Sequence, residues 1–345
     1  SLVGLGDVYK RQLSDSKEDL IIAANLIKSG KVVGIPTETV YGLGADAINP
    51  QAVKAVFAAK GRPADNPLIV HICSMRTVRI LAHDVPKLFY SLAERFWPGP
   101  LTMIVAKNNM VPYETSGGLD TVAIRMPAHP VMRSLIALTG PIAAPSANIS
   151  GYPSPTTAEH VLKDMNGKIP AIIDGGSCSF GVESTVISFD DNNTLRILRP
   201  GSITKNMLET VAPNVIVDKA IINDISEGQR ALSPGMKYKH YSPKANIVIV
   251  EGDIENFCRF VSENNKNGNY CLISDEDVKY DIPCRCLTYG KNSQQQAHNL
   301  FAKLRELDDL GAATVFVRPP SSKEDEGLAV YNRLLRAAGF EVISL

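Results

Sequence analysis

The chain has 345 residues, of which 44% are hydrophobic and 21% charged, and its 36 basic residues balance its 36 acidic residues. This composition is typical of a globular enzyme and excludes a disordered or fibrous chain. The zero net charge argues against a general nucleic-acid coat, which carries a basic excess. No apolar run reaches the roughly 18 residues that span a bilayer, so we expect no membrane partner.

The six cysteines are scattered and form no paired CxxC motif, so a structural zinc site is not expected. No signal peptide is visible, and we predict reduced thiols and a cytoplasmic location. Residues 1–12 lack an initiator Met and any capping pattern. We interpret them as a non-native leader and leave them out of the fold prediction.

Helical and β-branched segments follow one another from residue 13 to residue 212. Ser14 or Ser16 can cap a first helix, which stops at Gly30. Further helices are expected at residues 50–60, 85–96, 131–139 and 157–165, and strands at residues 31–35, 68–72, 101–106, 121–125, 142–144, 171–174, 184–189 and 194–198. This order predicts an α+β domain built around a twisted mixed sheet.

The segment from residue 213 to residue 245 differs from its surroundings. Within it, residues 233–243 contain two prolines, a glycine, two tyrosines, two lysines and a histidine. The prolines and the glycine argue against regular structure, and the other side chains argue against a mere spacer.

Strands and helices alternate again in residues 246–345. Strands are expected at residues 247–250, 270–274 and 314–317, and helices at residues 254–263, 293–310 and 327–338. The pattern predicts a small Rossmann-like α/β domain. No GxGxxG turn is present, so no dinucleotide is assigned to it.

Four cations stand at the ends of expected elements, each close to Pro or Gly: Lys60, Arg62, Arg125 and Arg199. The planar fork of Arg suits phosphate and carboxylate oxygens, and Lys supplies a compact charge. Such residues are mostly solvated surface charges, but the sharp turns beside these four weaken that interpretation. Lys60 and Arg62, together with Ser146 and Asn148 further along the chain, predict a seat for a polyphosphate, although no P-loop consensus is present.

Small polar groups follow one of the buried strands, at Ser146 and Asn148. Such a segment either exposes donors and acceptors to a ligand or simply turns the chain. His71 is a lone strand histidine, and no catalytic triad or HExxH motif accompanies it. Glu38 and Glu183 could hold Mg²⁺ through water, but their spacing gives no support.

Seven ordered motifs together resemble the threonylcarbamoyl-AMP synthase family in its long, two-domain form. They lie at residues 35–44, 60–63, 66–68, 97–102, 145–148, 184–186 and 199–201. The linker at residues 233–243 and the α/β tail also resemble that form, so the likeness covers nearly everything after Gln12. Each motif alone is weak, and their common order makes coincidence very improbable.

The resemblance implies a YrdC-like catalytic domain with a concave active-site face at residues 13–212. The implied enzyme is a nucleotidyltransferase that converts L-threonine, bicarbonate and ATP into threonylcarbamoyl-AMP and pyrophosphate. The released adenylate would then serve the machinery that transfers the threonylcarbamoyl group to tRNA. Mg²⁺ would accompany the ATP phosphates, and no protein ligand is assigned to it.

The resemblance also implies two groups of site residues. Those expected to hold ATP, with Lys60 and Arg62 as the catalytic pair, are Lys60, Arg62, Ser146, Asn148, Ser154, Arg199 and Tyr238. Those expected around threonine and the carbamate are Thr37, Tyr41, His71, Arg125 and Ser184. Residues 233–243 would fold over the pocket as a lid, with Tyr238 or Tyr241 over the nucleotide. A strap between the domains is the alternative.

Two other functions stay open from the sequence. A concave cationic sheet could form a double-stranded RNA or tRNA-binding module, although the neutral charge argues against strong binding. A carbamoyltransferase that uses another carbamoyl carrier is the second, and the partner domain argues against it.

Overall fold

The computed structural model describes residues 11–61, 66–191, 194–221 and 241–345. The chain divides into two compact units. The first comprises Ser1–Val85, Val105–Ile149 and Pro155–Cys178, and the second comprises Pro86–Ile104, Ser150–Ser154 and Ser179–Leu345. Among the described residues, no helix combines the length and the apolar character that crossing a membrane would need.

A mixed sheet forms the centre of the first unit. Its strands follow the order β1, β8, β2, β3, β7, β4 and β6. In chain order they span β1 (Arg11–Leu13), β2 (Val33–Ile35), β3 (Gly42–Asp46), β4 (Ile69–His71), β6 (Thr121–Arg125), β7 (Ile142–Ala143) and β8 (Ala171–Ile173). β3 and β7 run antiparallel to their neighbours, and the other pairs are parallel. The twisted mixed sheet expected from the sequence is therefore confirmed.

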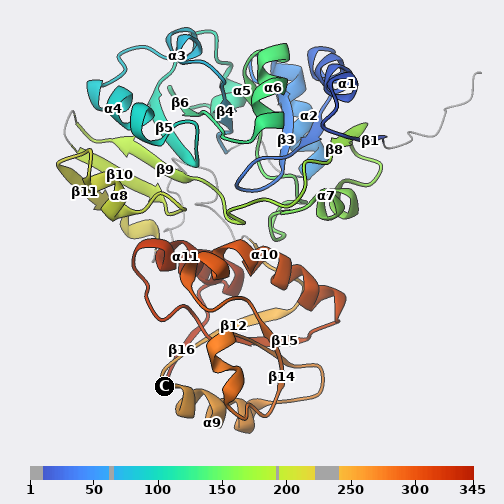
Figure 1. Ribbon diagram of the computed structural model, residues 1–345, viewed down its shortest axis with the longest axis vertical. Helices are drawn as coiled ribbons and strands as arrows, with labels where there is room; N and C mark the ends of the chain where they lie inside the picture. The colour runs from blue at the N-terminus through green and yellow to red at the C-terminus, as the bar shows by residue number, and fades with distance from the viewer. Residues whose placement is uncertain (1–10, 62–65, 192–193, 222–240) are drawn as a thin grey trace, which may run out of the picture. The chain divides into compact units, whose positions relative to one another are not determined.

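Helices cover this sheet. They are α1 (Lys17–Lys28), α2 (Pro50–Lys60), α3 (Met75–Leu81), α5 (Tyr113–Ser116), α6 (Pro130–Thr139) and α7 (Ala158–Met165). α1 starts at Ser16, whose side chain accepts a hydrogen bond from the Asp19 backbone N–H. α1 and α6 lie side by side (Figure 1) and bury Ile27 and Leu135 in one apolar cluster with Val33 of β2.

The second unit contains an N-terminal part, at residues 86–104, 150–154 and 179–221, and the whole α/β tail. The former has α4 (Lys87–Phe96), most of β5 (Leu101–Ala106), β9 (Thr185–Phe189), β10 (Thr194–Arg199), α8 (Lys205–Glu209), β11 (Asn214–Val217) and a short 3₁₀ turn, η1 (Lys219–Ile221). β9 lies between β5, to which it is parallel, and β10, to which it is antiparallel.

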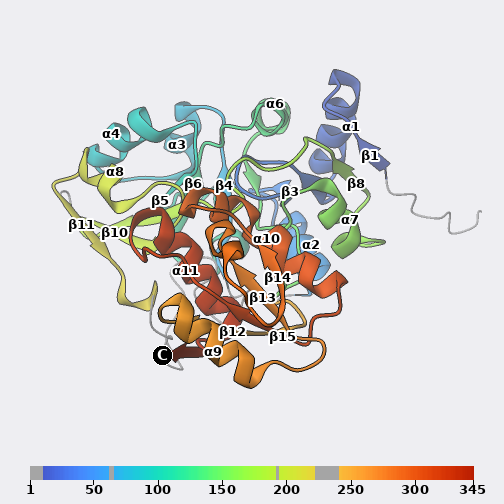
Figure 2. The same ribbon diagram turned by 60° about the horizontal axis from the view of Figure 1, so that its bottom comes forward.

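The tail is a parallel five-stranded sheet in the order β14, β13, β15, β12 and β16. The strands are β12 (Asn246–Glu251), β13 (Tyr270–Ile273), β14 (Arg285–Thr288), β15 (Thr314–Val317) and β16 (Val342–Ser344). α9 (Ile254–Asn264) covers one face, and α10 (Ser293–Asp309) and α11 (Asp325–Ala338) cover the other (Figure 1). β13 lies between β14 and β15 (Figure 2). The expected Rossmann-like α/β arrangement is confirmed.

The structure adds short elements that the sequence pattern did not predict: α3, α5, α8, β3, β11, β14 and β16. β3 contains two glycines, which depress strand propensity, and β14 is an edge strand whose first two residues are exposed. β1 begins at Arg11, so Arg11 and Gln12 pair with β8 although we left them out of the fold prediction. Residues 179–212 fall in the second unit, and the domain boundaries at residues 13–212, 213–245 and 246–345 stay a prediction.

Candidate functional site

Lys60 occupies the last position of α2, and the caps of that helix explain why. Asn49 precedes the helix and accepts hydrogen bonds from the backbone N–H groups of Gln51 and Ala52 at 3.0 and 3.3 Å. At the other end, Gly61 adopts a left-handed conformation with φ of 63°. A left-handed residue ends an α-helix, and glycine adopts it without steric cost. Lys60 is thereby held at the end of a rigid element.

The Lys60 side chain is buried and joins α2 to the segment that follows β7. Its ammonium donates hydrogen bonds to the backbone oxygens of Ser146 and Asn148, at 2.5 and 2.8 Å, and to Oδ1 of Asn148 at 3.4 Å. A buried ammonium needs such acceptors because water no longer supplies them. The structure therefore brings together three residues predicted to hold ATP, and Lys60 also fixes the backbone of the other two.

Arg125 lies at the end of β6 and is paired with an acidic side chain of the same unit. One of its amino groups lies 2.6 Å from Glu38 Oε1, and another donates a 2.9 Å hydrogen bond to Thr39 Oγ1. Burial raises the pKa of Glu38, but the charge and hydrogen bonds of Arg125 outweigh it, so the pKa lies below its usual value. Glu38 is therefore the ion-pair partner of Arg125 in this structure.

His71 lies beside Arg125, because the two residues are register partners on the parallel strands β4 and β6. Burial, reinforced by the positive charge of Arg125, lowers the pKa of His71 to about 3. The imidazole is therefore neutral at physiological pH. Its Nδ1 atom is buried and has no hydrogen-bond partner in the part of the chain that the structure describes. A neutral ring with an unused polar atom suits a ligand hydroxyl.

Thr37 and Tyr41 lie in the turn between β2 and β3. Thr37 Oγ1 donates to the Val40 carbonyl at 2.6 Å and so closes the turn. The Tyr41 hydroxyl donates to Gly176 O at 2.7 Å and accepts from Gly175 N at 3.1 Å. Burial raises the pKa of Tyr41 well above its usual range, so the hydroxyl keeps its proton. The Thr37 side chain is bonded to the backbone of its own turn, and that of Tyr41 to the backbone of the distant Gly175-Gly176 segment. Contact of either side chain with threonine stays a prediction.

The second unit brings Ser184 and Arg199 together. Arg199 donates from Nε to the Ser184 carbonyl at 3.0 Å and from Nη2 to Ser184 Oγ at 3.1 Å. Thr102 Oγ1 lies 2.8 Å from the same Oγ. All three side chains are buried. Ser184, expected at threonine, and Arg199, expected at ATP, thus share one hydrogen-bonded cluster.

Ser154 is hydrogen-bonded to the buried carboxylate of Glu183. Its hydroxyl donates to Glu183 Oε1 at 2.5 Å, and Arg333 Nε donates to Oε2 at 3.0 Å. Burial raises the pKa of Glu183. The charges of Arg333 and Arg199 and the Ser154 hydrogen bond lower it by more, so the pKa lies below its usual value. Glu183 is therefore the buried ion-pair partner of Arg333.

Two predicted site residues, Arg62 and Tyr238, and most of the predicted lid lie outside the described residues. The end of that segment is described: Tyr241 packs on Phe301 with ring centroids 5.1 Å apart, and the Ser242 backbone N–H donates to Gly151 O at 2.8 Å. Across residues 11–61, 66–191, 194–221 and 241–345, no three His, Cys, Asp or Glu side chains gather as metal ligands do.

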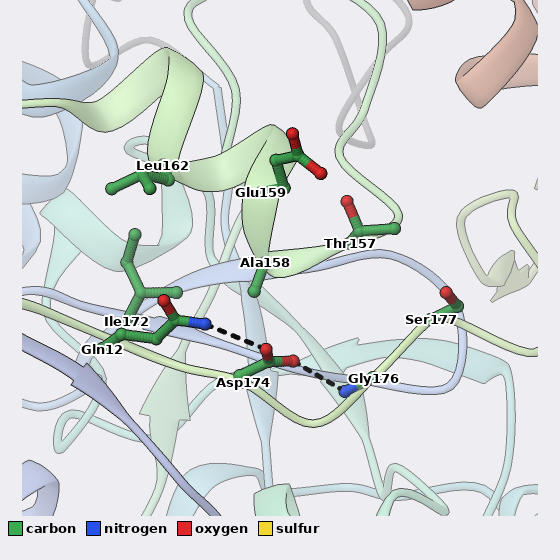
Figure 3. Close-up of a pocket in the computed structure, with 9 residues that line it drawn as sticks. All are labelled: Gln12, Thr157, Ala158, Glu159, Leu162, Ile172, Asp174, Gly176 and Ser177. Atoms are coloured by element: carbon green, nitrogen blue, oxygen red, sulfur yellow. Dashed lines mark hydrogen bonds between the residues drawn. The ribbon is translucent and has the colours of Figure 1, made fainter.

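A cavity of about 500 Å³ lies in the first unit beside the Asp174-Gly175-Gly176 turn (Figure 3). Asp174 accepts hydrogen bonds there from Gln12 Nε2 at 3.0 Å and from Gly176 N at 2.9 Å. The wall is formed by Gln12, Thr157, Ala158, Glu159, Leu162, Ile172, Asp174, Gly176 and Ser177. None of these was predicted as a site residue.

Three contributors to the site were missed by sequence reasoning: Thr39, Thr102 and Arg333. Thr39 and Thr102 stand inside motifs that were recognised, at residues 35–44 and 97–102, so those motifs were a usable signal. Arg333 is hydrogen-bonded to Glu183, 150 positions away in the sequence, and no local sequence pattern predicts this pair.

Comparisons with known proteins identify families and relatives that are similar to this chain. Residues 25–201 match the family model described as telomere recombination, and residues 203–339 match that of the threonylcarbamoyl-AMP synthase C-terminal domain. Threonylcarbamoyl-AMP synthase of Pyrococcus abyssi is 44% identical over 333 residues, which cover 94% of this chain and 95% of the relative. That of Bacillus subtilis is 42% identical, with 96% of each chain covered. The crystal structure of P. abyssi Sua5 complexed with L-threonine superposes with a TM-score of 0.88 at 42% identity, covering 97% of this chain and 98% of the other.

Proposed function

This chain belongs to the threonylcarbamoyl-AMP synthase family and shares its enzymatic activity, and we propose that its reaction joins L-threonine, bicarbonate and ATP with release of pyrophosphate. ATP and threonine are the substrates that the family name implies. The threonine complex of the P. abyssi relative supports a threonine pocket here. The product would enter threonylcarbamoyladenosine modification of tRNA.

The chemistry places two anions against each other. The threonine amine adds to the carbon of bicarbonate, water leaves, and a carbamate forms. A carbamate oxygen then attacks the α-phosphorus of ATP, and the bond to the β-phosphate breaks with its electrons on pyrophosphate. Fixed positive charge is needed to hold carbamate and triphosphate in line. No enzyme nucleophile is required, which agrees with the missing triad.

The observation that carries this proposal is the junction of Lys60 with Ser146 and Asn148. Its hydrogen bonds hold those two residues in one arrangement and place a buried positive charge beneath them. Preorganised charge and donors of this kind stabilise a transferring phosphoryl group without reorganising during the reaction. We propose that Lys60, Arg62, Ser146, Asn148 and Arg199 receive ATP.

The neutral His71 ring and the turn at Thr37 support a threonine subsite on the first unit. A site that hydrogen-bonds a substrate hydroxyl rejects analogues without it, because its own polar atoms are otherwise left unpaired. Arg125, Tyr41 and Ser184 would complete the surroundings of threonine and the carbamate. Since Arg125 is already paired with Glu38, the threonine carboxylate would share this guanidinium with it.

Mg²⁺ fits the described residues only as a companion of ATP, because they offer no protein cage. It would keep several waters and neutralise phosphate charge. No step of the mechanism above is assigned to it. The adenylate product is a mixed anhydride and therefore a labile acyl donor, so a separate transfer machinery acting on tRNA would consume it.

The test is pyrophosphate release by the full chain with ATP and with threonine and bicarbonate each left out in turn. We expect release only when both are present, and release that ignores threonine would contradict the proposed reaction. Lys60→Ala should lower kcat/KM by about a hundredfold, as removal of one preorganised donor does. Lys54→Ala is the matched control, because Lys54 lies on the same helix and 53% of its side chain is exposed.

The RNA-binding alternative predicts a different result. A module of that kind would bind tRNA with steep salt dependence and without ATP turnover. The synthase names of the relatives that cover nearly the whole chain favour the enzyme.

A further inference from the structure

Arg333, in the middle of α11, is fully buried although it carries a charge. Its guanidinium donates from Nε to Glu183 Oε2 at 3.0 Å, from Nη2 to the Glu183 carbonyl at 3.3 Å and from Nη1 to the Pro200 carbonyl at 2.5 Å. Nη1 also lies 3.2 Å from Asn332 Oδ1. Three nitrogens therefore bind the chain at two separate places.

Those two places are the immediate neighbours of proposed site residues. Glu183 precedes Ser184, and Pro200 follows Arg199. The two segments touch at the backbone, because a Cβ built on Gly201 would lie 2.5 Å from Thr185 N and 2.7 Å from Glu183 O. A single side chain from the α/β tail thus ties together the two segments that present Ser184 and Arg199.

The charges of this cluster explain why the side chain at position 333 has to be cationic. Glu183 is a buried carboxylate held ionised by Arg333 first and by Arg199 second. With Arg333 present, the three side chains sum to one positive charge, and Arg199 donates its hydrogen bonds to Ser184. Without Arg333 the sum is zero, and Glu183 is left with Arg199 as its remaining cationic partner. A buried carboxylate without its partner is strongly unfavourable, so Arg199 would be drawn towards it.

We propose that Arg333 is a positioning residue for adenylate synthesis: it occupies Glu183 so that Arg199 stays on Ser184 and keeps its positive charge for the nucleotide. This inference rests on the proposed function and gives the α/β tail a part in a site whose other described residues lie within residues 25–201. Arg333 itself touches neither substrate. Its effect reaches them through Glu183 and through the Pro200 carbonyl.

The experiment compares Arg333→Gln with the double variant Glu183→Gln/Arg333→Gln in the full chain. Pyrophosphate release gives kcat and KM for ATP, and calorimetric titration with ATP gives the affinity, both well below the melting temperature. Arg333→Gln should weaken ATP affinity and kcat/KM by about ten- to a hundredfold, as displaced site groups do. The double variant should regain most of the affinity, because no buried carboxylate remains to draw Arg199 away.

Arg336→Gln is the matched control. Arg336 is buried on the same helix but donates to the Ala220 carbonyl at 2.8 Å. The Arg336→Gln substitution should lower the melting temperature and leave KM for ATP unchanged.

Two results would overturn the inference: unchanged ATP affinity in Arg333→Gln, or a double variant whose ATP affinity is no higher than that of Arg333→Gln. If Arg333→Gln does not fold, the double variant still tests the inference. The double variant should fold and bind ATP with an affinity within about threefold of that of the single variant Glu183→Gln, because the effects of two residues in contact are not additive. Inactive wild type would instead contradict the proposed reaction.

Discussion

At the scale of single residues, three buried cations of this protein each have their own acceptor groups. Lys60 binds two carbonyls and an amide, Arg125 pairs with Glu38, and Arg333 pairs with Glu183. A buried charge without such a set costs several kcal/mol. Each set stands on or beside a residue assigned to substrate, so the same contacts that make burial tolerable also fix the candidate site.

His71 makes the stability of the protein depend on pH. Its pKa is about 3 in the folded chain and near 6.5 when unfolded. Between these values the unfolded chain binds a proton that the folded chain does not. The stabilisation is therefore complete above pH 6.5 and is lost, by about 1.4 kcal/mol for each pH unit, as pH falls towards 3. Urea unfolding at pH 7.5 and 5.5 should show this loss in the wild type.

The variant His71→Asn should lose less stability over the same interval, because it has no imidazole to protonate. His83→Asn is the control, since 53% of the His83 side chain is exposed, and it should follow the wild type. An identical pH dependence in His71→Asn and the wild type would show that the ring is not held neutral by burial.

At the scale of elements, helix caps decide where the proposed site residues stand. α2 begins at the Asn49 cap and ends where Gly61 turns left-handed, which leaves Lys60 in the final turn. Antiparallel pairing of β9 and β10, with a register shift between Ile197 and Arg199, brings Arg199 beside Val186 and so near Ser184. Backbone geometry therefore sets the positions of Lys60 and Arg199, and these positions decide which groups their side chains can reach.

Gly61→Ala tests the cap alone. A Cβ at Gly61 would meet nothing within 4 Å, so the only cost is the left-handed backbone at φ of 63°. That cost is about 1 kcal/mol for an L-residue. Urea unfolding should show the loss, and Gly61→Asn should lose less because Asn tolerates this conformation. Equal stability of Gly61→Ala and the wild type would mean that the chain ends α2 by another conformation at no cost.

At the scale of the whole molecule, the boundary between the two matched family models does not divide the second unit. α11, within the C-terminal match, sends Arg333 to Glu183 and Pro200, which lie within the N-terminal match. Asn332 and Arg336 of the same helix donate to the carbonyls of Ile221 and Ala220. Helix α11 therefore supports residues of the N-terminal match, at Glu183 and Pro200.

A chain ending at residue 245 should be less stable than the full protein. Removal of α11 takes Arg333 away from Glu183. Breaking a buried ion pair costs about 3–5 kcal/mol, and water that reaches Glu183 in the shortened chain makes this the upper bound of the loss from the pair. Introducing Glu183→Gln into the shortened chain should return part of that loss, measured as a higher urea midpoint. The same substitution in the full chain should lower the midpoint, because it breaks the pair there. A shortened chain indifferent to Glu183→Gln would contradict the support by Arg333.

The sequence by itself determined the elements with strong periodicity and the order of the motifs. The helix at residues 50–60 was predicted with its observed bounds, and the mixed sheet, the α/β tail and the family followed from local pattern and motif order. Such features depend on neighbours three or four positions apart or on short runs, which the sequence displays directly. Short edge elements such as β14 carry too few residues for such a pattern.

Only the tertiary structure decided the partners of the charged and polar side chains. Lys60 meets Asn148 across 88 positions, Arg125 meets Thr39 across 86, and Arg333 meets Glu183 across 150. Sequence reasoning did not pair Glu38 with Arg125 or Glu183 with Arg333, because nothing local reveals a distant guanidinium. Burial makes such pairs obligatory, but which residues are buried together is a property of the packed fold.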